Sequence, residues 1–240
     1  MHDLPHLDYA RICCIIGHSP LAMHATNTTA PDSGNMEVLH DYGSPSQKSL
    51  YLEGLKDGSI RSAFCMTEPE VASSDARNVG ENWTRGWREG RLERRMAGAT
   101  ARAKRQQSIV PPSHITNILP LVASLLTCLA PIIAGGTTFE RVERDGREGY
   151  VVNGRKWWST GVNDPRCKFM IVMGKIIKGE EKEKGHTMVI VPRDAEGFRI
   201  VRNLTVFGHD DAPFGHAEVE FTGCWVPTDN LLGGEGQGGR

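Results

Sequence analysis

The sequence has no excess of charge of either sign. Its 28 Lys and Arg residues against 29 Asp and Glu give a net charge of −1 over 240 residues. Such a chain has no overall field that would attract a polyanion, so neither a nucleic acid nor a membrane surface is the expected partner. A hydrophobic content of 39% and a charged content of 24% exclude disorder throughout and are typical of a globular protein.

Metal-binding spacings are missing as well. The six cysteines are far apart, except for the adjacent Cys13 and Cys14, and no two have the spacing of a zinc motif. Buried free thiols in a reducing compartment are therefore expected. His209 and His216 are expected to lie in a turn and a strand, so no metal site is predicted.

No uninterrupted hydrophobic run reaches the length of a membrane span. Residues 118–134 carry no charge but contain Pro120 and Pro131, and they fall short of the roughly 20 residues that a span needs. The first residues show neither a basic segment followed by an apolar one nor an Arg-rich amphipathic helix. No membrane span and no targeting signal are predicted, and the localisation is unknown from the sequence.

The first 62 residues have the pattern of helices. Met36, Leu39 and Tyr42 are spaced three apart and predict a helix that Gly43 ends in a left-handed cap.

A second helix is predicted from Ser44. Pro45 at the first helical position and Gln47 two residues later form the pattern of a capping box, and the helix should run to Gly58.

From about residue 138 the pattern changes to short strands. Two apolar runs predict buried strands, and two segments that alternate apolar with charged residues predict strands with one wet face. In chain order the four segments are residues 169–173, 187–191, 198–202 and 217–221. Asn153-Gly154 predicts a hairpin turn between strands. We expect a small antiparallel β-domain, for which a barrel is one possible form.

Residues 80–137 fit neither neighbouring zone. Residues 85–105 contain eight basic and two acidic side chains, and an apolar stretch follows. An arginine-rich arm for nucleic acid is one interpretation. Three glycines interrupt any continuous recognition helix, and no aromatic platform accompanies the arginines, so a disordered insertion is the prediction.

Two segments carry residues suited to chemistry. Residues 63–75 begin as a strand and break at Pro69 into small hydroxyl residues, whose backbone N–H groups could hold a pyrophosphate. The same pattern also fits an ordinary strand exit. In the second segment Trp157 and Trp158 stand before Ser159 and Thr160. Neighbouring side chains of a strand point to opposite faces, so one indole would enter the core while the other lies against a ligand.

Together these two segments resemble the acyl-CoA dehydrogenase family, in particular its members ten and eleven. The likeness continues through residues 16–21, 30–39, 164–168, 206–208 and 226–238. It covers about 180 of the 240 residues, everything outside the middle zone.

The resemblance implies an α+β fold of several parts. Residues 1–62 would be the second half of an N-terminal helical domain, and residues 63–79 with 138–234 a middle β-barrel domain. Residues 80–137 would be an atypical insertion, for which unspliced or misassembled coding sequence is our hypothesis. Residues 235–240 would begin a truncated C-terminal domain, whose four helices would be absent.

The resemblance also implies FAD as cofactor and an acyl-CoA as substrate. The residues placed along the cofactor are Phe64, Cys65, Met66, Thr67, Glu68, Pro69, Ser73, Ser74, Trp157, Trp158 and Ser159. Thr67 would hydrogen-bond the isoalloxazine edge and Ser159 its N5 region, because donors placed where negative charge develops favour the reduced ring. Trp157 would pack on the ring. Ser74 would lie near the FAD pyrophosphate or the CoA moiety.

The resemblance also implies partners and a reaction mechanism. This chain would supply only some of the residues that the mechanism needs. Electron-transfer flavoprotein would accept the electrons, the subunits would form a homo-oligomer, and the compartment would be a mitochondrion or a peroxisome. The base that removes the α-proton is a glutamate of the C-terminal helices, so no catalytic residue is assigned. Glu68 is expected to have a structural or surface role. An acyl-CoA oxidase and a non-catalytic, partner-binding β-domain remain alternatives.

Overall fold

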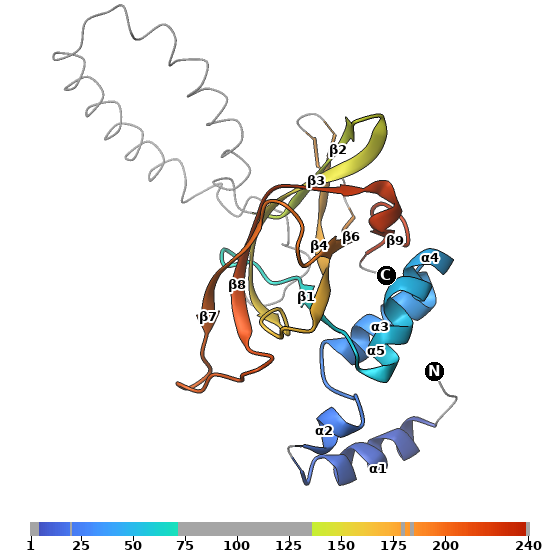
Figure 1. Ribbon diagram of the computed structural model, residues 1–240, viewed down its shortest axis with the longest axis vertical. Helices are drawn as coiled ribbons and strands as arrows, with labels where there is room; N and C mark the ends of the chain where they lie inside the picture. Colours follow the sequence, from blue (N-terminus) through green and yellow to red (C-terminus); the bar gives the residue numbers. More distant parts are fainter. Residues whose placement is uncertain (1–4, 20, 72–135, 179–180, 183–184, 239–240) are drawn as a thin grey trace, which may run out of the picture.

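A computed structural model describes residues 5–19, 21–71, 136–178, 181–182 and 185–238. Helices gather at one end of the molecule and strands at the other (Figure 1). Ser73, Ser74 and Cys128 lie outside the described residues, as does the predicted insertion up to residue 135.

Within the described residues, the α-helices and one π-helix precede the first strand. They are α1 (His6–Ile16), α2 (Ala22–Ala25), α3 (Asp32–Tyr42), α4 (Pro45–Gln47), the π-helix η1 (Lys48–Leu52) and α5 (Glu53–Asp57). The predicted capping box is present, with Ser44 Oγ accepting from Gln47 N at 3.2 Å and Gln47 Oε1 accepting from Ser44 N at 2.9 Å. Helical structure continues from there to Asp57, and Gly58 ends it at a φ of 76°. No helix in the described ranges is both long and apolar enough to cross a membrane.

The predicted left-handed cap at Gly43 is wrong. Gly43 has an extended backbone, with φ of −70° and ψ of 141°. A Cβ there would lie 2.4 Å from the Leu39 carbonyl oxygen, so the missing side chain serves close packing against the helix end. Tyr42 is exposed rather than part of the buried stripe. The chain must turn at once into the capping box at Ser44, which leaves no room for a cap of the usual kind.

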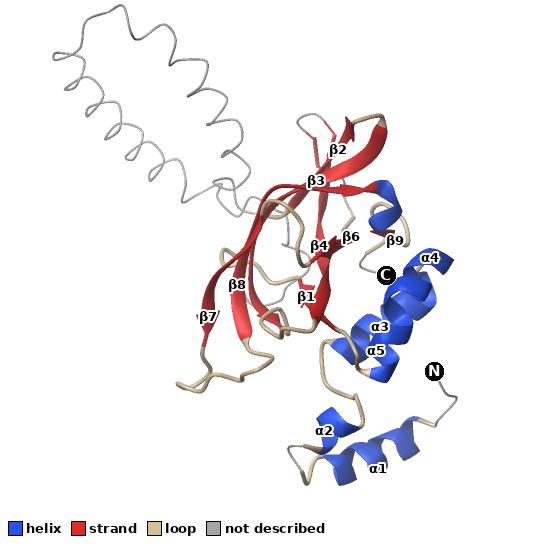
Figure 2. Ribbon diagram, in the orientation of Figure 1, coloured by secondary structure: helices blue, strands red, loops and turns tan. Residues whose placement is uncertain are grey.

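The strands form one curved sheet (Figure 2). They are β1 (Arg61–Cys65), β2 (Thr138–Arg144), β3 (Arg147–Thr160), β4 (Cys167–Lys178), β5 (Glu181–Lys182), β6 (Thr187–Pro192), β7 (Phe198–Leu204), β8 (His216–Pro227) and β9 (Leu231–Leu232). The order is β7-β8-β3-β2-β4-β6-β9, with β1 and β5 also paired to β4. A short 3₁₀ helix, η4 (Thr228–Asn230), precedes β9. The predicted α+β fold with a mostly sheet middle domain is confirmed.

The run 169–173 within β4 is apolar because both of its faces are buried. Met170 and Val172 belong to the core enclosed by the sheet. Phe169 and Ile171 belong to a second core, formed with the helices α3, η1 and α5. The same division holds in β6, where Ile190 faces the helices. The continuous apolar runs seen in the sequence therefore do mark strands buried on two sides.

The predicted hairpin turn at Asn153-Gly154 is also wrong. Strand β3 runs through both residues, and the turn lies at Asp145 and Gly146, whose φ values are 55° and 72°. The pairing of β3 with β8 shifts register between Val152 and Gly154. The dipeptide thus forms a β-bulge, in which the backbone freedom of glycine is used inside a strand.

Thr137 is part of the sheet domain, although the insertion was predicted to extend through it. Its side chain is fully buried, and its carbonyl oxygen accepts from Lys175 N at 3.1 Å. A Cβ on Gly154 would lie 2.6 Å from Thr137 Cα, so the bulge in β3 makes space for this residue.

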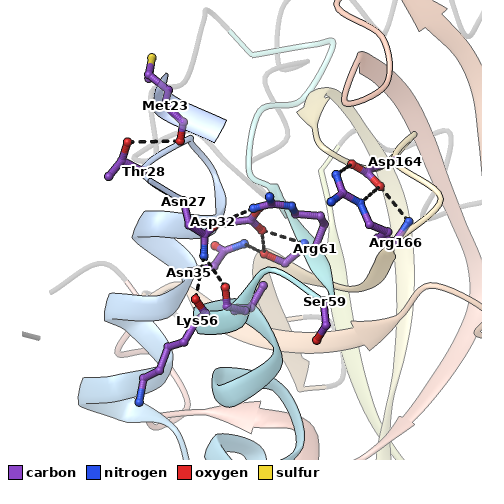
Figure 3. A network of polar contacts seen from close by, with 12 residues as sticks. Met23, Asn27, Thr28, Asp32, Asn35, Lys56, Ser59, Arg61, Asp164 and Arg166 are labelled. Atoms are coloured by element: carbon purple, nitrogen blue, oxygen red, sulfur yellow. Dashed lines mark hydrogen bonds and ion pairs between the residues drawn. The ribbon is translucent and has the colours of Figure 1, made fainter. Parts of the chain in front are cut away.

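A buried polar network joins the helices to the sheet (Figure 3). Asp32 of α3 pairs with Arg61 of β1 at 3.1 Å. Asn35 Nδ2, one helical turn further, donates to Ser62 Oγ at 2.8 Å and to the Ala63 carbonyl at 3.2 Å. The start of β1 is therefore fixed by side chains of α3, directly before the segment that the sequence marks as functional.

Candidate flavin-facing site

The two segments singled out in the sequence meet in the structure. Trp157 N of β3 donates to the Thr67 carbonyl oxygen at 3.0 Å. Its neighbour Lys156 donates from Nζ to the Met66 carbonyl oxygen at 2.7 Å. The loop that leaves β1 is thus held along the last residues of β3, although about 90 residues of sequence separate them.

A second irregularity in β3 sets how this surface is presented. Lys156 pairs with Val219 of β8 and Ser159 with Ala217, so the register shifts between them. Trp158, inside the shift, has a φ of 53°, a conformation uncommon outside glycine. Lys156 and Ser159 are both buried as a result, while Trp157 is half-buried and Trp158 is 40% exposed.

The strand alternation predicted for the two indoles therefore fails, because the bulge interrupts it. Neither tryptophan enters the core. Trp158 instead lies with its ring 5.9 Å from that of His216, edge to face. His216 is held at both nitrogens, by Thr160 Oγ1 at 2.8 Å and by Asp211 Oδ2 at 2.8 Å. The histidine thus contacts two side chains at the end of β3 and supports them. The described residues contain no group of three or more side chains that could hold a metal ion.

Two buried polar atoms of this surface, Ser159 Oγ and Trp157 Nε1, have no nitrogen or oxygen hydrogen-bond partner among the described residues. The polar side chain beside Ser159 is the Cys65 thiol, a weak hydrogen-bonding group. A buried donor left unsatisfied costs about 1–3 kcal/mol, so two of them within three residues are costly unless a ligand supplies acceptors. FAD carries oxygen and nitrogen acceptors that could satisfy such donors, and this donor set fits it.

The last two side chains of β1, Phe64 and Cys65, pack in the two cores of the domain. Cys65 belongs to the core of the sheet, and burial raises the pKa of its thiol to about 11, with smaller opposing effects from Ser159 and Lys156. Phe64 packs against the helix-side core. Both could approach a ligand only through their backbone. Met66, Thr67 and Pro69 are half-buried.

The sequence did not identify Lys156, the most unusual residue here. Its side chain is 0% exposed and its Nζ lies 2.9 Å from Glu68 Oε1. Burial lowers the pKa of Lys156, and the Glu68 carboxylate opposes that shift. The surface role considered for Glu68 is wrong, since only 1% of the residue is exposed.

The alternation of side chains along a strand could have predicted that Lys156 is buried. Tyr150, Val152, Gly154 and Lys156 follow one another at alternate positions and all are buried. A lysine in this series lies on the core face and requires a buried partner. Nothing in the sequence says that the partner is Glu68, 88 residues away.

Comparison with known proteins identifies the family of this fold. Residues 133–224 match the family model of the acyl-CoA dehydrogenase middle domain. Family member 11 from Gallus gallus is 39% identical over 238 residues, which are 98% of this chain and 23% of that protein. Family member 10 from Mus musculus is 35% identical over 235 residues, which are 98% of this chain and 16% of that protein.

Solved structures show the same fold. A structure of an acyl-CoA dehydrogenase homologue from Mycobacterium abscessus is 36% identical, with a TM-score of 0.68, over 98% of this chain and 43% of that one. Butyryl-CoA dehydrogenase from Megasphaera elsdenii, 20% identical, has a TM-score of 0.51 over 85% of this chain and 36% of its own. At that identity the second match supports the fold alone.

The curved sheet, packed on helices, has the fold of the middle domain of acyl-CoA dehydrogenases. The chain belongs to the acyl-CoA dehydrogenase family. It spans about a quarter of the length of the family member 11 protein that it matches.

Proposed function

We propose that this chain forms the flavin-facing part of an FAD-dependent acyl-CoA dehydrogenase. The single observation that carries the proposal is the pair of buried donors, Ser159 Oγ and Trp157 Nε1, that have no nitrogen or oxygen partner among the described residues. Family membership supplies the identity of the acceptor. FAD, when bound, would provide the ring that takes up the β-hydride of an acyl-CoA.

The roles of the residues follow from what each can donate or cover. Ser159 Oγ would donate to the N5 region of the ring, where negative charge develops on reduction. Trp157 would pack on the ring, held in place through its backbone bond to Thr67. Thr67 would hydrogen-bond the isoalloxazine edge. Trp158 would flank the cofactor from the exposed side of β3.

Other parts of the proposal rest on the family resemblance only. Ser74, or Ser73 in its place, would lie near the FAD pyrophosphate or the CoA moiety. Electron-transfer flavoprotein as acceptor, a homo-oligomeric assembly and a mitochondrial or peroxisomal location are proposed on the same ground. No base for the α-proton is assigned among the described residues.

The test is an absorbance spectrum of the purified chain after incubation with FAD and removal of the free cofactor. A retained flavin band that weakens in Trp157→Phe, Ser159→Ala and Thr67→Ala supports the proposal. Trp225→Phe is a matched control, because Trp225 also has a buried, unpartnered Nε1 but lies elsewhere, against Gly149. A folded chain that retains no flavin contradicts the proposal and favours a non-catalytic partner-binding domain.

Adding acyl-CoA substrates to the loaded chain separates the enzyme classes. Bleaching of the flavin band without peroxide indicates a dehydrogenase. Peroxide formed in air indicates an acyl-CoA oxidase, in which oxygen reaches the reduced ring.

A further inference from the structure

Glu68 and Lys156 form a buried ion pair that connects three separate segments. Lys156 Nζ, on β3, donates to Glu68 Oε1 at 2.9 Å and to the Met66 carbonyl at 2.7 Å. The same Glu68 oxygen accepts from Thr137 N at 2.6 Å. The pair thus ties the loop after β1 to β3 and to the residue that precedes β2.

Stability alone is a poor reason for such a pair. Removing two charges from water costs several kcal/mol for each ion, and well-packed apolar residues often replace a buried pair without loss. The side chains here are 0% and 2% exposed, so the desolvation is complete. What an apolar pair could not reproduce is the set of directed bonds to the Met66 carbonyl and the Thr137 amide.

These bonds lie beside the groups assigned to the flavin. Two consecutive residues of β3, Lys156 and Trp157, hold two consecutive carbonyls of the loop, those of Met66 and Thr67. Ser159 follows after the bulge in the same strand. The distance between the loop and the strand, and with it the position of Thr67 relative to Trp157 and Ser159, is therefore set at Lys156.

We propose that Glu68 and Lys156 are positioning residues, which hold the loop 66–68 against β3 so that the flavin-facing groups are in place before the cofactor arrives. The inference rests on the proposed flavin role of this surface. Hydrogen-bond donors that are already in position lose little conformational entropy when the ligand binds. Donors on a loosened loop must be ordered during binding, and this lowers the affinity.

The test uses the whole chain and two altered forms of the pair. Glu68→Gln keeps the shape and the acceptor oxygen but removes one charge, and the double variant Lys156→Met with Glu68→Leu replaces the pair by apolar side chains. The control is Asp32→Asn, which breaks a buried ion pair at the helix junction, away from this surface. All are compared at a temperature at which each is folded by circular dichroism.

Hydrogen exchange gives the readout without cofactor. The amides of Thr137 and Trp157, bonded to Glu68 Oε1 and the Thr67 carbonyl, should exchange faster in the double variant, while amides inside β4 should not. Asp32→Asn should leave both amides protected. Unchanged exchange at Thr137 and Trp157 in the double variant would overturn the positioning role.

Affinity for FAD gives the second readout. We expect the dissociation constant to rise roughly tenfold or more in the double variant, since small displacements of positioned groups are costly, and less in Glu68→Gln, which retains its hydrogen bonds. Equal affinity in the native chain and both variants overturns the positioning role alone. A native chain that binds no FAD overturns the proposed function itself, and the positioning role with it.

Discussion

Asp32, in the first turn of α3, accepts hydrogen bonds from both donors of Ser62, from the backbone N at 2.8 Å and from Oγ at 2.6 Å. Its other oxygen receives Arg61 Nη1 at 3.1 Å. One carboxylate therefore fixes the first two residues of β1 to the helices, upstream of the loop that carries Thr67. We expect the helices and the sheet to lose their fixed relation when this carboxylate is removed.

Asp32→Asn should lower the free energy of unfolding by about 3 kcal/mol, because it leaves the buried Arg61 guanidinium without its charge partner. Urea unfolding followed by circular dichroism measures the change. Asp8→Asn is the matched control, since Asp8 also lies in the first turn of a helix but its pair with Arg11 is exposed, so a change below about 0.5 kcal/mol is expected. Similar losses in the two variants would refute the role given to Asp32.

Asp164 should make the stability depend on pH in the acid range. Burial raises the pKa of Asp164, but hydrogen bonds from Arg166 outweigh it and hold that pKa below its usual value. Because the folded pKa is the lower one, the stabilisation is present above the unfolded pKa, near 4, and is lost as pH falls through the folded pKa. Asp164→Asn should remove this contribution to the decrease of the free energy of unfolding at acid pH.

Unfolding midpoints at pH 7 and pH 3 test this expectation. The Asn variant should be about 1 kcal/mol less stable at pH 7, a modest value because Arg166 is partly exposed. At pH 3 the difference should shrink. A constant difference between the two pH values would show that the carboxylate charge has no part in the stabilisation.

The parts of the fold that sequence reasoning predicted are those that depend on neighbours along the chain. The capping box at Ser44 is a contact between residues three apart. The apolar run 169–173 needs burial on two faces whatever the partners are. Both features are therefore visible in local pattern alone.

The features that were missed depend on pairing between distant segments. Asn153-Gly154 has the chemistry of a hairpin turn, but β8 pairs on both sides of it, and the strand continues. The bulge before Ser159 arises in the same ladder and exposes Trp158. The Glu68–Lys156 pair joins residues 88 positions apart. The periodicity of a sequence does not show how two strands pair in register. The residues of the site could therefore be named from the sequence, but the directions of their side chains could not be predicted.

Gly154→Ala should destabilise the sheet domain strongly. The φ of this residue is 150°, and an added Cβ would lie 2.6 Å from Thr137 Cα, a backbone atom that cannot move aside. Backbone strain and overpacking together suggest a loss of about 2–4 kcal/mol. Thermal unfolding gives the measurement.

Gly34→Ala is the control for that substitution. Gly34 lies within α3, and an added Cβ would meet nothing within 4 Å. Alanine in an exposed helical position should stabilise by about 0.5–1 kcal/mol. If both variants shift the melting temperature in the same direction, the space around Thr137 is not the limiting factor.

The described cysteines fall into two classes that a thiol reagent should separate, contrary to the expectation that all are buried. Cys13 and Cys14 are exposed, whereas Cys65, Cys167 and Cys224 are buried and free. Burial raises the pKa of the Cys167 thiol to about 12 and that of Cys224 to about 11, so little reactive thiolate forms at pH 8. Treatment with N-ethylmaleimide for minutes, followed by peptide mass spectrometry, should label Cys13 and Cys14 in the folded chain. The three buried residues should react only in denaturant, and rapid labelling of Cys65 in the native state would mean that the core beneath Ser159 opens readily.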